Sequence, residues 1–201
     1  MLKTVFAAIL LTFAGISFAA SAAQETDNVI HEELRGVLAG VQDAINAKKY
    51  DDLAPYFSEN MRVTTINQEA LSNRSEIAPY FKKWFGAGGF LKDLTFTLNA
   101  DALTELDATK AFGIVRGSGV ENYALSDGRR FDMKTRWTAT VVKGADKKWR
   151  ILALHIGTNF LDNPILDAAK SMLIRVGVFC AAGGLVVGVL LAFLFLRRKS
   201  N

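Results

Sequence analysis

Hydrophobic positions along the chain change their spacing near residue 90, and the change divides the central region into two parts. Between residues 30 and 45, apolar side chains recur every three or four positions, which predicts an amphipathic helix. Two shorter helices are expected before the change, over residues 51–57 and from a cap at Ser75 to Phe85. A short strand is expected between them, over residues 61–66.

After a glycine-rich break at residues 86–89, the apolar period becomes two. Four strands are expected over residues 91–98, 110–121, 129–143 and 148–156. Helices followed by antiparallel strands predict an α+β domain, with the helices packed on one face of a curved sheet. The triplet Gly117-Ser118-Gly119 lies inside a strand pattern, where we expect a bulge or a bend rather than a nucleotide-binding loop.

Two long apolar runs lie at the ends of the chain. Residues 1–23 have Lys3, an apolar stretch and a small-residue site, Ala20-Ser21-Ala22, which is typical of a signal peptide cut after Ala22 or Ala23. An uncleaved N-terminal anchor is the alternative. Near the other end, residues 176–196 carry no charge, and at about 1.5 Å per residue they span about 31 Å, the thickness of a bilayer core.

These runs predict a single-pass membrane protein. A transmembrane helix is expected over residues 174–196, followed by a basic tail at 197–201 that the positive-inside rule places in the cytoplasm. The main domain, residues 24–160, would then lie outside, joined to the membrane by a linker at 161–173. This topology suits a bacterial inner membrane with a periplasmic domain.

The net charge of +4 comes from the ends of the chain. All acidic residues lie between Glu25 and Asp167, and the basic residues between Arg35 and Lys170 leave this region at −1. A near-neutral domain lacks the basic surface that nucleic-acid binding requires, so nucleic acid is excluded as a partner.

The single cysteine, Cys180, and two histidines bound the chemistry further. No disulfide is possible within one chain, and we expect neither a metal site nor a cofactor. Within the predicted membrane helix, small residues recur every fourth position and predict helix–helix association in a homodimer. The alternative is that glycine is simply common in membrane helices. These small residues are Cys180, Gly184, Gly188 and Ala192.

Three short motifs follow one another in the central region. Residues 46–58 read NAKKYDDLAPYFS, residues 135–138 read TRWT, and residues 148–151 read KWRI, followed by His155. In this order they resemble the SnoaL-like branch of the NTF2-like (cystatin-like cone) superfamily. The resemblance implies a cone in which helices close over a bent sheet with a pocket between them, and it implies a dimer. Because the superfamily includes isomerases, cyclases, dehydratases, ligand binders and oligomerisation modules, the fold does not decide the function.

Several polar and aromatic side chains are candidates for lining that pocket. His155 is the candidate for a proton-transfer or anion-binding group, and the alternative is a histidine satisfied in the core. Arg136 and Thr138 share one strand face, where the arginine would clamp a carboxylate, as would Arg62. A solvent-facing cross-strand pair is the alternative for these arginines.

Tyr56 and Trp84 belong to an aromatic group around the helices, which would line a pocket or simply form core. A carboxylate-driven isomerase needs a base and an acidic donor in an apolar cavity, for which Asp101, Asp132 and Tyr123 are candidates. These residues do not align with the catalytic pattern of the isomerases.

The sequence therefore predicts a membrane-anchored extracytoplasmic module that binds a small apolar ligand or serves in assembly. The alternative is an isomerase or lyase of SnoaL type that acts on a small apolar compound without metal or nucleotide. A third reading is a scaffold whose cone is filled by its own side chains.

Overall fold

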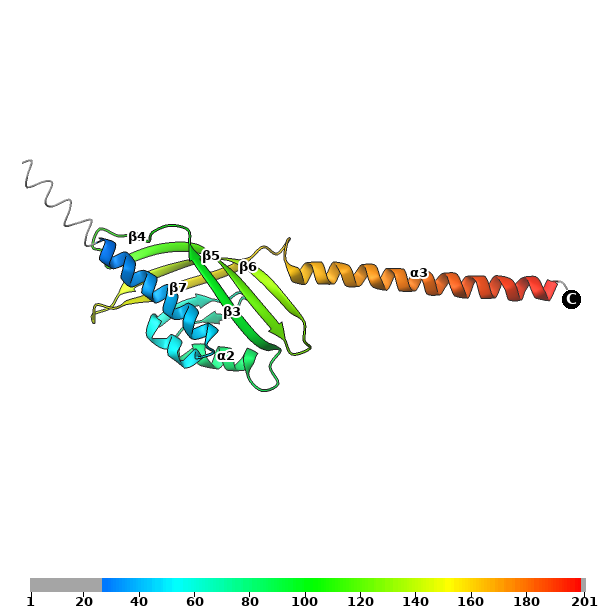
Figure 1. Ribbon diagram of the computed structural model, residues 1–201, viewed down its shortest axis with the longest axis horizontal. Coiled ribbons are helices and arrows are strands. Elements are labelled where there is room, and N and C mark those ends of the chain that lie inside the picture. Colours follow the sequence, from blue (N-terminus) through cyan, green and yellow to red (C-terminus); the bar gives the residue numbers. More distant parts are fainter. Residues whose placement is uncertain (1–26, 200–201) are drawn as a thin grey trace, which may run out of the picture. The chain divides into compact units, whose positions relative to one another are not determined.

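The computed structural model describes residues 27–199, so the expected signal peptide at residues 1–23 lies outside the described part. The chain divides after Thr158 into two compact units. In the first unit a helix over residues 27–46 precedes the remaining elements (Figure 1). These are η1 (Tyr50–Tyr56), β1 (Phe57–Thr64), β2 (Ala70–Leu71), η2 (Arg74–Glu76), α2 (Ile77–Phe85), β3 (Leu91–Ala100), β4 (Glu105–Leu106), β5 (Phe112–Leu125), β6 (Arg130–Lys143) and β7 (Trp149–Thr158).

The strands form one sheet in the order β2-β1-β7-β6-β5-β3, with β4 paired to β5. The four long strands β3, β5, β6 and β7 pair antiparallel, which confirms the α+β arrangement predicted from the alternating pattern. β1 pairs with β7 in parallel, a contact between segments far apart in the sequence. Gly117 and Gly119 pair on both sides without a register shift, so this triplet holds no bulge, and the bend expected as its alternative stays a prediction.

Local chemistry explains where the short helices begin. Residues 50–56 form a 3-10 helix that contains Pro55, whose missing N–H suits a short helix. The next turn begins with Asn73, whose side chain accepts a hydrogen bond from the Ser75 amide. Asn73 rather than Ser75 is therefore the cap of this segment, and the expected single helix is a 3-10 turn followed by α2.

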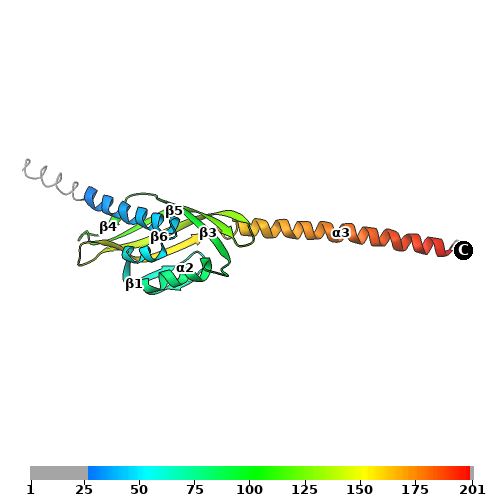
Figure 2. The same ribbon diagram turned by 60° about the horizontal axis from the view of Figure 1, so that its bottom comes forward.

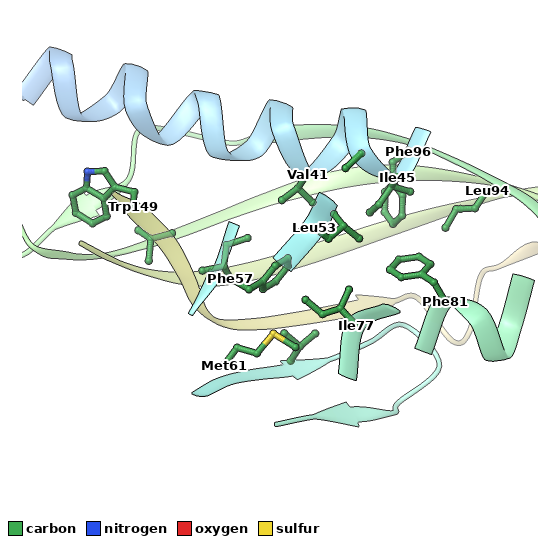
Figure 3. Close-up of a cluster of buried hydrophobic side chains, with 14 of the residues drawn as sticks. Val41, Ile45, Leu53, Phe57, Met61, Ile77, Phe81, Leu94, Phe96 and Trp149 are labelled. Carbon is green, nitrogen blue, oxygen red and sulfur yellow. The ribbon is translucent and has the colours of Figure 1, made fainter. Parts of the chain in front are cut away.

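The core lies on one side of the sheet, which we call the inner face, while the opposite side is the outer face. On the inner face, side chains from helices and strands pack together, including Leu53 and Met61, which are almost completely buried (Figure 3). Burying one such side chain contributes about 1.5–3 kcal/mol. The contributing residues come from the first helix, η1, β1, α2, β3, β5, β6 and β7, among them Val41, Ile45, Phe57, Ile77, Phe81, Leu94 and Trp149.

The first helix also covers the open edge of β3. Asn46 donates to the Phe96 carbonyl over 3.0 Å and accepts from the Phe96 amide over 2.6 Å. Gln42 accepts from the Leu98 amide over 2.8 Å. These side chains satisfy backbone groups that an edge strand would otherwise leave unpaired. In both views the first helix runs along the sheet (Figure 2). Ile77 and Phe81 of α2 belong to the same core as Val41 and Ile45 of this helix, so both helices cover the inner face.

The second unit contains α3 (Pro164–Lys199), a continuous helix of 36 residues. Its start is capped by Asn163, whose side chain accepts from the amides of Ile165 and Leu166. It contains an 18-residue stretch with a mean hydropathy of 2.6, so it is long and apolar enough to span a membrane. Most of the expected linker at 161–173 belongs to this helix, together with the expected span at 174–196.

Candidate functional site

The inner face of β5 carries a buried carboxyl group, that of Glu121. Glu121 is 1% exposed, and no other charged residue in the range 27–198 is buried. Phe96 of β3 and Met133 of β6 are its direct cross-strand partners, and both are buried. An acid among apolar side chains is costly, because the charged form loses its hydration.

Tyr123 and Thr135 supply the polar contacts of this carboxyl group. The Tyr123 hydroxyl donates a hydrogen bond to Glu121 Oε2. The buried Thr135 hydroxyl, on the adjacent strand, lies close enough to the carboxyl to favour its ionised form but does not form a hydrogen bond with it. Glu121 Oε1 is also buried, and it has no hydrogen-bond partner among the described residues.

Burial sets the protonation of this pair. It raises the pKa of Glu121 to about 7, although the nearby Tyr123 and Thr135 hydroxyls favour the ionised form. The pKa of Tyr123 is raised well above its ordinary value, first by burial and then by the negative charge of Glu121. Tyr123 therefore stays protonated, and Glu121 is able to give or take a proton near neutral pH.

Two glycines make room beside Glu121 on β5. A Cβ at Gly117 would overlap the Trp137 ring, and a Cβ at Gly119 would stand 2.8 Å from Thr135 Oγ1. The Trp137 indole consequently lies against the strand and donates to the Ser118 carbonyl over 3.0 Å. The glycines thus serve close packing on the inner face.

A polar cluster, which we call the α2 clasp, joins α2 to the turn after β1. Glu69 is its centre: it accepts from Trp84 Nε1 over 2.8 Å and pairs with Lys83 over 2.9 Å. Asn67 donates to Glu69 over 2.9 Å and accepts from the Tyr80 hydroxyl over 3.2 Å. Lys83 leads the contacts that hold the pKa of Glu69 below its ordinary value.

Tyr80 links the clasp to the interior. Its pKa is raised chiefly by burial and further by the negative charges of Glu69 and Glu121. Tyr80 is therefore close to both the surface carboxylate and the buried one.

Four of the residues predicted to line the pocket lie together on the outer face instead. Arg62, Arg136, Thr138 and His155 are exposed, and Thr138 pairs directly with His155. Arg136 is held by an ion pair with Asp101, and one Arg62 nitrogen donates to the Ser72 carbonyl over 2.8 Å.

The position of His155 follows from an irregularity in β7. Ile151 pairs with Val141, and Ala153 pairs with Thr140, so Leu152 is an extra residue in the strand. Alternation from Trp149 and Ile151 would place His155 on the inner face, but the extra residue reverses the order. His155 consequently faces outward, away from Glu121.

The remaining candidates have mixed positions. The Tyr56 ring fills the space above Gly40 of the first helix and is half-buried, whereas Trp84 belongs to the α2 clasp. Asp101 and Asp132 are exposed, and of the isomerase candidates Tyr123 alone meets the buried carboxyl. Across residues 27–199, no group of three His, Cys, Asp or Glu side chains is placed to hold a metal ion.

Solved structures share this fold at low sequence identity. A protein with a cystatin-like fold from Caulobacter vibrioides is 18% identical with a TM-score of 0.54, and the match covers 72% of this chain and 96% of that one. A ketosteroid isomerase-like protein from Erwinia carotovora atroseptica is 10% identical with a TM-score of 0.53, and the match covers 64% of this chain and 95% of that one. A type 2 hexachlorocyclohexane dehydrochlorinase is 10% identical with a TM-score of 0.55, and the match covers 68% of this chain and 90% of that one.

No protein-family profile and no curated protein sequence matches the chain. At these identities the structural likeness shows the fold alone. The folded unit therefore has the NTF2-like, cystatin-like cone architecture, a curved sheet closed on one face by helices, with a long apolar helix after it.

Proposed function

We propose that the protein is a membrane-anchored, extracytoplasmic cone domain that binds a small, largely apolar ligand against Glu121 and Tyr123. The observation that carries this proposal is Glu121 Oε1, a buried carboxyl oxygen without a hydrogen-bond partner among the described residues. A ligand placed beside Glu121 would supply the missing contact.

The energetic cost of Glu121 supports a ligand rather than a filled scaffold. Leaving a buried polar group unsatisfied costs about 1–3 kcal/mol, and more when the group is charged. A cone that served packing alone would be more stable with an apolar residue on this strand. The cross-strand neighbours Phe96 and Met133 suit a ligand whose body is apolar.

The anchoring part of the proposal rests on α3 and the charges around it. Its uncharged stretch, residues 176–196, matches the thickness of a bilayer core, and basic residues follow it directly. With an N-terminal signal peptide, the cone would face the periplasm and the tail the cytoplasm. The small-residue face of α3 (Cys180, Gly184, Gly188 and Ala192) would bring two copies together.

The outer-face residues fit an assembly role better than a ligand role. Arg62, Arg136, Thr138 and His155 share one exposed face of the sheet, where they would contact a second copy of the domain. This division gives the inner face to the ligand and the outer face to the homodimer.

Proton-transfer catalysis is the second candidate function, of the isomerase or lyase type. Its specific support is the pKa of Glu121, about 7, since an acid or base works best when its pKa is near the ambient pH. Tyr123 would position the carboxyl group through its hydrogen bond. Ketosteroid isomerase-like and dehydrochlorinase structures share the fold.

Labelling with dicyclohexylcarbodiimide tests the proposed binding site. This small apolar reagent adds to protonated carboxyl groups, so an interior that admits apolar compounds gives rapid labelling of Glu121. The full chain in lipid nanodiscs is treated at pH 6 and at pH 8 and mapped by mass spectrometry. We expect Glu121 to be labelled ahead of the exposed acids and faster at pH 6, because its carboxyl is then protonated.

Two variants complete the experiment. In Glu121→Gln, the peptide that contains position 121 should carry no label, because glutamine has no carboxyl group. Glu59→Gln, at an exposed acid paired with Arg74, should leave the labelling of Glu121 unchanged. Labelling confined to exposed acids, with Glu121 unreactive at pH 6, would show that the interior is closed and would contradict the proposal.

A further inference from the structure

The hydrogen-bonding groups around Glu121 leave one donor and one acceptor free. The Tyr123 hydroxyl is already used, because it donates to Glu121 Oε2. Among the described residues, the Thr135 hydroxyl is then the one polar hydrogen beside the carboxyl that lacks a partner. The aromatic donors of α2 and β6 point to other acceptors: Tyr80 to Asn67, Trp84 to Glu69 and Trp137 to the Ser118 carbonyl.

This inventory disfavours a ligand that presents a carbonyl or an oxyanion. Such a group needs two or more donors aimed at its oxygen, as in an oxyanion hole. Beside Glu121 the described interior offers a single free donor, the Thr135 hydroxyl, and it offers an acceptor, Glu121 Oε1, which has no hydrogen-bond partner. A ligand that donates hydrogen bonds is therefore the better complement.

The local charge points the same way. The groups that act on the Glu121 carboxyl are the hydroxyls of Tyr123 on its own strand and Thr135 on β6. Tyr80 of α2 is the other titratable group that senses its charge. No lysine, arginine or histidine of the described chain acts on this carboxyl, and Lys83 of the clasp is paired with Glu69. The ionised form of Glu121 thus has no cation from the protein.

We infer that the site takes an organic cation, a small ammonium compound with an apolar body whose N–H group contacts Glu121 Oε1. This inference rests on the proposed function and specifies its ligand. A charge-assisted hydrogen bond to an ammonium group would satisfy the carboxylate and supply its missing counter-charge. Phe96, Met133 and Tyr123 surround the carboxyl with aromatic and thioether groups, which are favourable neighbours for an organic cation.

Three probes of nearly equal size separate the ligand classes: 2-phenylethylammonium, 2-phenylethanol and phenylacetate. They are cationic, neutral and anionic across the useful pH range. The full chain in lipid nanodiscs carries 13C-labelled glutamate, and the pH titration of the Glu121 carboxyl signal is followed with each probe at saturation. Glu121→Gln identifies the signal, and Glu59→Gln is the matched control at an exposed acid.

We expect the amine to lower the pKa of Glu121 by at least about 1, because a nearby cation favours the ionised form. Affinity for the amine should rise with pH between the lowered pKa of the bound state and about pH 7, by about tenfold for each unit by which the pKa is lowered, and should be flat outside this interval. In Glu121→Gln, the affinity for the amine should fall at least about tenfold, while that for 2-phenylethanol stays the same.

Two results would overturn the inference and remain distinct from a failure of the proposed function. If phenylacetate or 2-phenylethanol binds more tightly than the amine and raises the pKa of Glu121, the site is for acceptors and the cation is wrong. If the amine leaves the Glu121 titration unchanged while the carbodiimide still labels Glu121, the interior is open but does not select cations. Failure of carbodiimide labelling bears on the proposed function itself.

Discussion

The two faces of the sheet hold acidic side chains in opposite electrostatic states. On the inner face, burial raises the pKa of Glu121 to about 7. At the end of β3, Asp101 pairs with Arg136 of the outer face, and this guanidinium holds the pKa of Asp101 below its ordinary value. Both are carboxylic acids, one within β5 and one directly after β3, so their surroundings, rather than their chemical type, determine what each can do.

The comparison separates structural charges from chemically available ones. A carboxylate with an arginine partner and water around it has little reason to take up a proton or a ligand near pH 7. A buried carboxyl group without a cationic partner has both capacities. The inner face is therefore the place to seek chemistry, although the sequence offers more charged residues on the outer face.

The largest difference between the faces should be in stability. Phe96 of β3 is buried on the inner face, and its neighbour Thr95 is exposed on the outer one. Phe96→Ala should lower the free energy of unfolding by about 3–5 kcal/mol, because it removes apolar contacts and leaves a cavity. Thr95→Ala should change it by less than about 0.5 kcal/mol. Urea unfolding of the full chain, followed by tryptophan fluorescence, measures both, and equal effects would show that the faces are not distinct.

The next effect is a pH dependence with a defined sign. Glu121 titrates near 4.5 when unfolded and near 7 when folded, so the folded state binds more protons between these values. Its contribution to the free energy of unfolding should therefore fall by about 3 kcal/mol as the pH rises from 4.5 to 7, and stay constant above.

The difference between wild type and Glu121→Gln isolates this contribution from that of the other acids. Urea unfolding at pH 5, 6, 7 and 8 should show the variant gaining stability relative to wild type up to pH 7. A constant difference across this range would mean that burial does not shift the titration of Glu121.

Two glycines give a smaller contrast. A side chain at Gly117 would overlap the Trp137 ring and the Asn99 carbonyl, whereas a Cβ at Gly157 has nothing within 4 Å. Gly117→Ala should cost about 1–3 kcal/mol through overpacking. Gly157→Ala should be neutral or stabilising by up to about 1 kcal/mol, since alanine restricts the unfolded chain. Thermal unfolding compares the two, and a tolerated Gly117→Ala would show that β5 is free to move away from β6.

The alternation of apolar residues was enough to predict most of the sheet. The strands β3, β5, β6 and β7 each bury one face, and this leaves a period of two in the sequence. The same alternation holds the signal for the site, because Gly117, Gly119, Glu121 and Tyr123 are on one face of β5. Tyr123 is a candidate from the sequence, whereas Glu121 is not, because an acid in a strand is usually exposed and only its neighbours in the folded sheet show that it is buried.

Other features depend on contacts that no local pattern records. The parallel pairing of β1 with β7 joins residues about 90 positions apart, so neither strand predicts it alone. The extra residue Leu152 in β7 reverses which side chains face inward, and this single irregularity moved His155 from the predicted pocket to the outer face. Such a shift is decided by packing of the whole sheet.

The smallest effect should come from the outer-face acid and should have the opposite pH sign. The pKa of Asp101 is lowered by Arg136, so the pair stabilises the fold above the ordinary aspartate pKa and is lost as the pH falls through the lowered value. Asp101→Asn should give a slight loss of stability at pH 7 that disappears in 1 M salt and in acid, because the pair is exposed and screened. As the pH rises, the free energy of unfolding of Glu121→Gln increases relative to wild type, while that of Asp101→Asn decreases relative to wild type. The free energy of unfolding of each variant, relative to wild type, is measured by urea titration at several pH values. If it changed with pH in the same direction for both variants, the surroundings of the two acids would not control their charge states.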